Sequence, residues 1–253
     1  MNYAIWESVE LFNQTMQTNT LYLPASTRRF EDFGFMQAYL SFKPHLSTER
    51  QNFGSLITID DGTLQPGATG FGLHPHKDVE VVTFMVSGEV KHIDPNDASH
   101  NGTLKSKGVQ IITAGSGIAH NEENNSSTEP MRALQIWFTP RAKNLSPNYK
   151  RKHLESEQYI NKLTCILSPD GRNDSLLVQQ DVYLNYGNFA KSAKLTYQPR
   201  LVGNQSFIYI IEGEMNVIGQ QLEQGDGFGI KSNEEFSMDI LEQAEFLVFD
   251  VPR

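Results

Sequence analysis

An internal repeat is the feature that most constrains the fold of this chain of 253 residues. Residues 83–93 read TFMVSGEVKHI and residues 208–218 read IYIIEGEMNVI, so each half has two short apolar runs around a Gly-Glu pair. Residues 133–140, ALQIWFTP, match residues 245–252, EFLVFDVP, in the same way. Self-similarity over such distances indicates one architecture that is built twice.

The repeated segments have the composition of β-strands. Runs of β-branched and aromatic residues on either side of a glycine predict β-hairpins at Gly88 and Gly213. Gly108 and Gly225 are expected to open further hairpins. Short strands separated by glycines, with few helical patterns, favour an all-β barrel or sandwich in each half.

Three less regular segments complete the expected organisation. FMQAYLSF, residues 35–42, is compatible with a strand, and residues 95–107 have the composition of a surface loop. Residues 141–160 are predicted to be a linker that includes some helical turns.

Charge and composition exclude several classes of protein. The formal net charge of −9 argues against direct nucleic-acid binding, which needs clustered Lys and Arg. No apolar run reaches the length of about 18 residues that a transmembrane helix needs, and the first residues lack the pattern of a signal peptide. The single cysteine, Cys165, is expected to be buried and fits a reducing compartment. We therefore expect a cytoplasmic protein without a membrane partner.

Two motifs in the N-terminal half contain residue types that bind metals. Alternate residues of a strand share a face, so His74 and His76 in LHPHKD would present both imidazoles to one spot. His120 and Glu122 show the same spacing after the glycine-rich segment AGSGIA. Two such pairs on facing strands would converge as three nitrogen ligands and one oxygen ligand. The alternative is that they are polar residues at a barrel mouth, satisfied by hydrogen bonds alone.

These motifs resemble those of the pirin family in the cupin superfamily. The strings FGLHPHKDVEVVTF, AGSGIAHNEEN, STEP and LQIWFTP carry the resemblance over residues 70–150, and it continues more loosely to the C-terminus. The resemblance is greatest to short bacterial pirin-like proteins with quercetinase activity. It implies a bicupin, made of two tandem cupin (jelly-roll-like) β-barrels. A metal-binding barrel would span residues 1–145, and a linker with a second barrel would span residues 146–253.

The resemblance implies one metal, held by His74, His76, His120 and Glu122. Glu80 is the rival fourth ligand, because general cupins often use the carboxylate that follows the His-x-His motif. If Glu122 is the ligand, Glu80 would accept a hydrogen bond from a histidine N–H or would be a structural group.

The C-terminal half is not expected to bind metal. Residues 154–253 contain no histidine, and an alignment of the two halves places Pro199 and Leu201 where His74 and His76 stand. The second barrel would therefore cover or brace the first.

Several other residues have ordinary explanations. We expect His92 to have a surface or packing role, and His45 and His100 to be solvated loop residues. Phe84 and Trp137 are expected to pack in the core. Asn124 is expected to form a turn or a side-chain hydrogen bond near the site.

The donor set points to a divalent transition metal. Three imidazoles and one carboxylate suit iron(II), zinc, manganese, nickel, copper or cobalt, and iron(II) is the first choice because an open N/O site suits O₂ chemistry. The resemblance implies a quercetin 2,3-dioxygenase-like oxidoreductase that cleaves a flavonol such as quercetin with O₂. Glu122 would then act as a ligand and as a catalytic base. The partners would be a small aromatic, flavonol-like substrate and O₂.

Two other functions are compatible with the same residues. One is a non-catalytic, metal-binding regulatory module that binds a protein partner, and the other is an isomerase or sugar-binding cupin. An enzyme needs an enclosed, mostly apolar pocket around the metal. Four apolar residues fit either a pocket wall or the core: Phe71, Leu73, Phe84 and Ile118.

Overall fold

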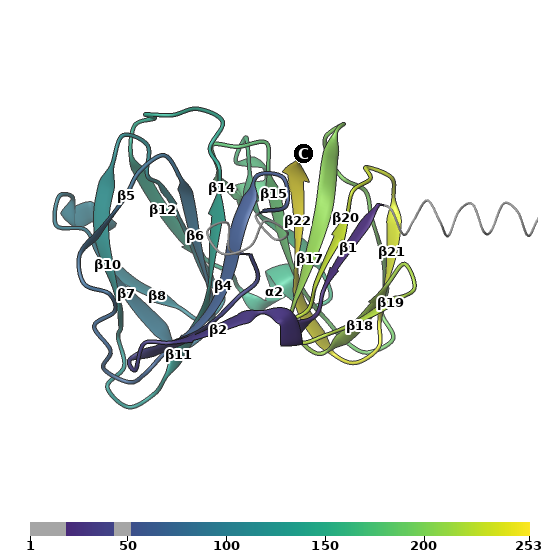
Figure 1. Ribbon diagram of the computed structural model, residues 1–253, viewed down its shortest axis with the longest axis horizontal. Coiled ribbons are helices and arrows are strands. Elements are labelled where there is room, and N and C mark those ends of the chain that lie inside the picture. Colours follow the sequence, from purple (N-terminus) through teal and green to yellow (C-terminus); the bar gives the residue numbers. More distant parts are fainter. Residues whose placement is uncertain (1–18, 43–51) are drawn as a thin grey trace, which may run out of the picture.

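The computed structural model describes residues 19–42 and 52–253, and these are mostly β-strand. The strands in these ranges form two sheets of seven strands and two sheets of four. Figure 1 shows two barrels side by side, with most of the N-terminal half in one and most of the C-terminal half in the other. The predicted all-β architecture, built twice, is confirmed.

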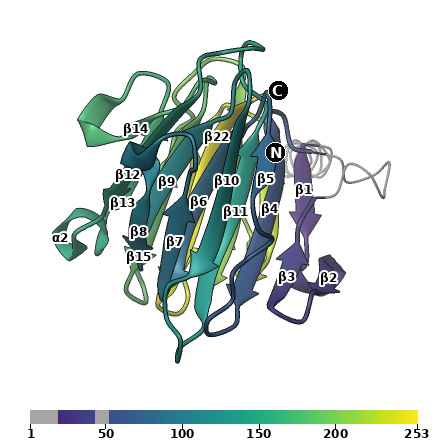
Figure 2. The ribbon, with the colours of Figure 1, turned by 90° about the vertical axis from the view of Figure 1, so that its left-hand side faces the viewer.

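The N-terminal barrel packs a large sheet against a small one. The order of strands in the large sheet is β12 (Asn148–His153), β9 (Gly108–Thr113), β6 (Glu80–Ser87), β11 (Met131–Phe138), β4 (Leu56–Leu64), β3 (Met36–Leu40) and β2 (Arg29–Asp32). The small sheet, which faces the viewer in Figure 2, consists of β5 (His74–His76), β10 (Ile118–Asn124), β7 (Glu89–Ile93) and β8 (Gly102–Lys105).

The C-terminal barrel repeats this plan. Its large sheet has the order β1 (Thr20–Leu23), β20 (Gly227–Ile230), β17 (Asn204–Glu212), β22 (Ala244–Pro252), β15 (Tyr183–Phe189), β13 (Leu163–Ser168) and β14 (Leu176–Leu177). Its small sheet consists of β16 (Lys194–Tyr197), β21 (Phe236–Ile240), β18 (Glu214–Val217) and β19 (Gln220–Glu223).

Helices are short throughout the described part of the chain. They are η1 (Ala25–Thr27), η2 (Ala98–His100), α2 (Ser156–Tyr159) and η3 (Arg172–Asp174). None of the helices in residues 19–42 and 52–253 has the length and apolar character that crossing a membrane requires. The segment 95–107, predicted to be a loop, contains η2 and also β8, which pairs with β7.

Each barrel takes an edge strand from the segment that precedes the other barrel. β1 precedes the N-terminal barrel but pairs with β20 of the C-terminal one. β12 lies in the segment predicted to be a linker but pairs with β9 of the N-terminal barrel, so residues 141–160 are more than a linker. The domain division between residues 145 and 146 stays a prediction, and two strand pairings cross it.

Gly88 and Gly213 do not form the predicted hairpins. β6 and β7 belong to different sheets, as do β17 and β18, so the chain passes at each glycine from the large sheet to the small one. Gly88 has a φ of 74°, which favours glycine, and a Cβ there would lie 2.8 Å from the Cα of Met131. The hairpins expected at Gly108 and Gly225 are absent for the same reason, because the strands on either side lie in different sheets.

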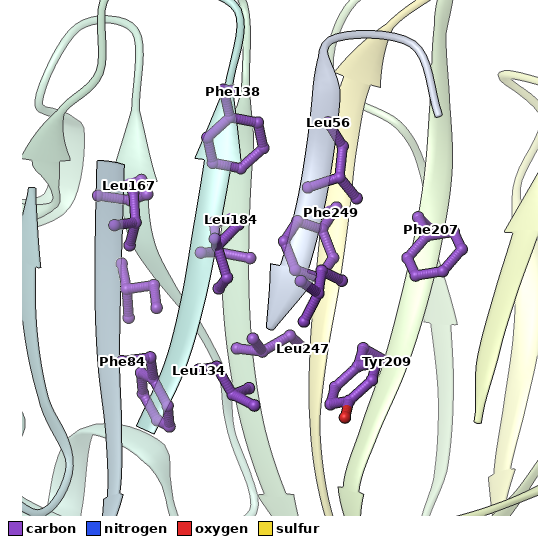
Figure 3. Close-up of a cluster of buried hydrophobic side chains, with 14 of the residues drawn as sticks. Leu56, Phe84, Leu134, Phe138, Leu167, Leu184, Phe207, Tyr209, Leu247 and Phe249 are labelled. Atoms are coloured by element: carbon purple, nitrogen blue, oxygen red, sulfur yellow. The ribbon is translucent and has the colours of Figure 1, made fainter. Parts of the chain in front are cut away.

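The largest apolar core lies between the two barrels. Alternate residues of β6, such as Val82 and Phe84, point out of the N-terminal barrel and pack against the large sheet of the C-terminal one. Figure 3 shows buried side chains from both halves in this cluster, among them Phe84, Leu134, Phe138, Leu184, Phe207, Leu247 and Phe249. The predicted core role of Phe84 is confirmed.

The interiors of the two barrels differ. Apolar side chains such as Met238 and Phe246 fill the C-terminal barrel. In the N-terminal barrel the inward apolar residues form two separate clusters, and Thr83 on β6 stands between Val81 of one cluster and Met85 of the other. A polar layer therefore crosses the N-terminal barrel, and it is there that the predicted site residues lie.

Candidate metal centre

The three histidines of the predicted site converge inside the N-terminal barrel. In the pairing of β5 with β10, His74 stands opposite His120, and His76 is two residues farther along the same face. The ring centroids are 4.6 Å apart for His74 and His120, 4.9 Å for His76 and His120, and 5.0 Å for His74 and His76. One nitrogen of each ring lies within 4.8 Å of the others, so a single ion could contact all three.

The electrostatic setting favours the neutral form of His76 and His120, which is the form that binds metals. Burial and the neighbouring His74 lower the pKa of His76 to about 4. Burial and the other two rings lower the pKa of His120 to about 3. The Nδ1 atom of His74 donates to the Gly72 carbonyl at 2.8 Å, which leaves its Nε2 lone pair available. The Nε2 atom of His120 is buried and has no hydrogen-bond partner among the described residues.

Glu122 lies beside the histidine trio rather than within it. It forms a second group of potential metal ligands with His92 and His120, and it stands opposite His92 in the pairing of β10 with β7. The structure thus places the four predicted side chains in two overlapping groups that share His120. The assignment of all four as ligands of one ion stays a prediction.

Three donors from the large sheet hold the Glu122 carboxylate across the barrel. Its Oε1 accepts hydrogen bonds from Thr83 at 3.0 Å and Gln110 at 2.6 Å, and its Oε2 accepts one from Gln135 at 2.7 Å. In the large sheet, Gln135 of β11 pairs with Thr83 of β6, and Thr83 pairs with Gln110 of β9, so the three donors lie side by side. Asp60 of β4 pairs with Gln135 and begins the same row. Each carboxylate oxygen has two lone pairs, so Oε2 has room for one more partner.

Sequence reasoning missed these three donors. A signal was present, because Thr83 and Gln135 are polar residues at inward positions of otherwise apolar strands. Their common target could not be read from the chain, since it depends on which strands are neighbours.

Glu80, the rival fourth ligand, does not face the histidines. It lies on β6 with the parity of Val82 and Phe84, toward the C-terminal barrel. Its Oε2 accepts hydrogen bonds from Thr113 Oγ1 at 2.9 Å and from the backbone N–H of Gln179 at 3.1 Å. This is the structural role considered for Glu80, and it connects the two halves of the chain.

A Glu80→Gln variant is expected to gain stability over the wild type as the pH rises. Burial disfavours the charged carboxylate of Glu80 and raises its pKa from 4.5 to about 7, so the folded state favours the protonated form. The stability that this group contributes is present below pH 4.5 and is lost as the pH rises through 7. Between pH 5 and pH 8 the variant should gain up to about 3 kcal/mol relative to the wild type in urea unfolding. The exposed Glu234→Gln variant is the control, and a difference between Glu80→Gln and the wild type that does not change with pH would contradict the expectation.

A cavity of about 310 Å³ lies beside the histidine trio. His74, His76 and Glu122 form part of its wall. Most of the rest is apolar and includes Phe33, Met36, Leu40, Leu64, Phe71, Val90, Met131, Ala133 and Trp137. A mostly apolar hollow with a few convergent polar groups is typical of a small-molecule site.

Not all of the apolar residues that were considered for the pocket wall line the cavity. Phe71 lines the cavity, whereas Ile118 is in a core cluster and Leu73 is 61% exposed. Trp137 packs against a core cluster, as predicted, and it also lines the cavity, because the alternation of β11 turns it inward. Its ring stands edge-on to His76, with 5.2 Å between the centroids.

The remaining histidines are placed as follows. His92 is fully buried, which excludes a surface position and leaves the packing role. The prediction of a solvated His100 is wrong, because its Nδ1 lies 2.8 Å from Asp94 Oδ2 and its side chain is 18% exposed. His45 lies outside the described residues.

Two minor predictions are confirmed. Asn124 organises a turn, because its Nδ2 donates to the backbone carbonyls of Leu64, Gln65 and Glu129. Cys165 is buried.

Within residues 19–42 and 52–253, no equivalent group of potential metal ligands lies inside the C-terminal barrel. The strand β21, which takes the place of β10, presents the buried apolar residues Phe236, Met238 and Ile240. The predicted equivalence of Pro199 and Leu201 with the His-x-His pair is wrong, because β16, the counterpart of β5, ends at Tyr197.

Comparisons with known proteins agree with this arrangement. Residues 17–138 match the family model described as Pirin, and residues 165–251 match the quercetinase C-terminal cupin domain. The quercetin 2,3-dioxygenase of Escherichia coli K12 is 30% identical over 230 residues, which cover 90% of this chain and 96% of that protein. The chain belongs to the pirin family. A pirin-like protein of Caulobacter vibrioides is 28% identical to this pirin over 222 residues, 87% of this chain and 94% of the relative.

The fold of this pirin is also similar to a solved pirin structure. The crystal structure of bacterial pirin YhhW from Escherichia coli in complex with nickel(II) superposes with a TM-score of 0.86 and 28% identity, and covers 92% of this chain and 99% of that chain. The predicted family and its two cupin domains are therefore confirmed. The histidine group of this pirin has the composition of a metal site, and a related pirin binds a transition metal.

Proposed function

We propose that this pirin is a metal-dependent dioxygenase that cleaves a flavonol such as quercetin with O₂ in its N-terminal barrel. The observation that carries the proposal is the mostly apolar cavity of about 310 Å³ with His74, His76 and Glu122 in its wall. A flat aromatic substrate suits such walls, and the names of the curated relatives point to the same chemistry. A regulatory module that only binds a protein partner would not need a mostly apolar cavity beside its metal ligands.

The residues present fit a bound metal. His74, His76 and His120 would hold it, with the unpartnered Nε2 of His120 as one donor, and Glu122 would complete the set through Oε2. Iron(II) is our first choice, and zinc, manganese, nickel, copper or cobalt would fit the same donors. When bound, the metal supplies Lewis acidity and a redox centre for the reaction with O₂.

The protein's own contribution is to move a proton and to orient the substrate. Glu122 would act as ligand and base in turn. Its Oε2 has one spare lone pair, which would hold the metal before the substrate binds and would accept the proton of the substrate hydroxyl afterwards. Thr83 and Gln110 fix the other oxygen, so the carboxylate keeps its orientation while Oε2 reacts. The apolar wall, including Trp137 beside His76, would hold the aromatic rings and exclude water.

Elemental analysis of protein purified without chelators tests the site. We expect about one transition metal per chain in the wild type and little metal in His74→Ala or Glu122→Ala, because each removes a ligand. His153→Ala removes an exposed histidine on β12 and should keep the metal. Metal retained in both ligand variants would refute the site.

Quercetin turnover tests the reaction. The metal-loaded wild type should consume quercetin only when O₂ is present. Consumption at the same rate under anaerobic conditions would exclude a dioxygenase mechanism.

A further inference from the structure

The proposed mechanism does not use His92, although this histidine is buried against a proposed ligand. His92 has no exposed surface, and its Nδ1 lies 3.5 Å from the Nδ1 of His120. The two ring centroids are 5.0 Å apart. The Nε2 of His92 is buried and has no hydrogen-bond partner among the described residues. Such a buried imidazole in contact with a ligand calls for an explanation beyond packing.

The contact between the two Nδ1 atoms fixes where the protons must be. A histidine that binds a metal through Nε2 carries its proton on Nδ1 and donates it to a neighbour. For His120, the hydrogen-bond partner found at Nδ1 is His92. His92 must therefore offer a lone pair at Nδ1 and carry its own proton on Nε2. The reverse arrangement would put the proton of His120 on Nε2 and block the metal-binding nitrogen.

Tyr149 supports His92 and links it to Glu122. Its ring stacks on His92 with centroids 4.5 Å apart and an interplanar angle of 28°. Its hydroxyl donates to Gln110 Oε1 at 2.9 Å, and Gln110 Nε2 donates to Glu122 Oε1 at 2.6 Å. One tyrosine on the edge strand β12 thus contacts the residues that position both His120 and Glu122.

We propose that His92, backed by the ring of Tyr149, is a positioning residue that sets the proton and the orientation of His120 and thereby the metal affinity. The inference rests on the proposed function, because it takes His120 as a ligand. It goes beyond that function by assigning a role to two residues outside the ligand set.

A matched pair of variants tests the role, with zinc as the probe. His92→Phe keeps a ring to stack on Tyr149 but offers no lone pair to His120. His92→Asn places an amide oxygen near the position of Nδ1 and restores an acceptor. We expect His92→Phe to weaken zinc binding by roughly 10- to 100-fold and His92→Asn to recover most of that loss. A role in packing alone predicts the opposite order, because phenylalanine fills the space better than asparagine.

Nitrogen-15 NMR of the histidine rings in the zinc-loaded wild type gives a second test that needs no variant at His92. We expect the proton of His120 on Nδ1 and that of His92 on Nε2. Tyr149→Phe, which keeps the ring stack and loses only the hydroxyl, should leave both proton positions unchanged.

The possible failures are distinguishable. Equal zinc affinity in His92→Phe and the wild type would overturn the inference and leave the proposed function standing. Two zinc ions per wild-type chain and one in His92→Phe would also overturn it, because His92 would then be a ligand. A wild type that binds no zinc, iron or nickel would overturn the proposed function together with the inference.

Discussion

Replacing Glu122 with glutamine is expected to lower the rate of quercetin cleavage by roughly 10²- to 10⁴-fold, the usual contribution of a catalytic base. The amide has nearly the shape of the carboxylate but cannot accept a proton from the substrate hydroxyl. Two of the three donors that now hold Glu122 are themselves amides, Gln110 and Gln135, and they can rotate to hold a glutamine. The rate of quercetin loss, divided by the metal content of each preparation, separates lost catalysis from lost metal.

Glu123→Gln is the matched control for this experiment. Glu123 is the next residue on β10 and points away from the site, toward Lys91, whose Nζ lies 3.3 Å from its carboxylate. Its replacement should leave the rate per metal ion unchanged. If Glu122→Gln turned over quercetin as fast per metal ion as this control, Glu122 would not be the base.

The second large effect is expected on stability, in an Asp61→Ala variant. The Asp61 carboxylate on β4 is 6% exposed and accepts hydrogen bonds from Arg132 at 2.9 and 3.0 Å, from the Tyr209 hydroxyl at 2.9 Å and from Arg28 at 3.2 Å. Burial alone would raise the pKa of Asp61, but these donors, Arg132 foremost, hold it below its usual value. Removing the carboxylate leaves a mostly buried guanidinium without its partner, which costs about 3–5 kcal/mol.

Urea unfolding measures this cost, and Asp181→Ala is the control. Asp181 makes an ion pair with Arg141 at 3.3 Å, but both side chains are about half exposed, at 55% and 45%. Its removal should lower the free energy of unfolding by less than about 1 kcal/mol. A similar loss in the two variants would mean that burial of the Asp61 cluster between the barrels adds nothing.

Much of the fold and part of the site can be predicted from the sequence because they depend on local patterns. The repeat and the alternation of apolar residues predict the doubled all-β architecture, and the His-x-His spacing predicts that His74 and His76 share a face. The partners of each strand are not local. Gly88 shows this, since the same strand–glycine–strand sequence fits a hairpin or a corner between sheets. The outcome depends on which strands lie beside β6 and β7 in the folded barrel.

The surroundings of Glu122 and His120 were hidden for the same reason. Thr83, Gln110 and Gln135 come from three strands, and only their register in the sheet places them under one carboxylate. His92 has the inward parity on β7, but the sequence around it does not show that His120 is its neighbour. The stack of Tyr149 on His92 is even harder to predict from the sequence, because β12 lies in a segment that resembles a linker.

The exchange of edge strands also has a consequence for the order in which the chain can fold as it leaves the ribosome. β1 is the first described strand to be synthesised, but its partner β20 ends at Ile230, so β1 must wait for nearly the whole chain. The N-terminal barrel is likewise open at the edge of β9 until residues 148–153 have emerged. An uncovered sheet edge invites pairing with the wrong strand. We therefore expect the pairing of β1 with β20 to be the last step of folding. This pairing completes the large sheet of the second barrel and links the two barrels.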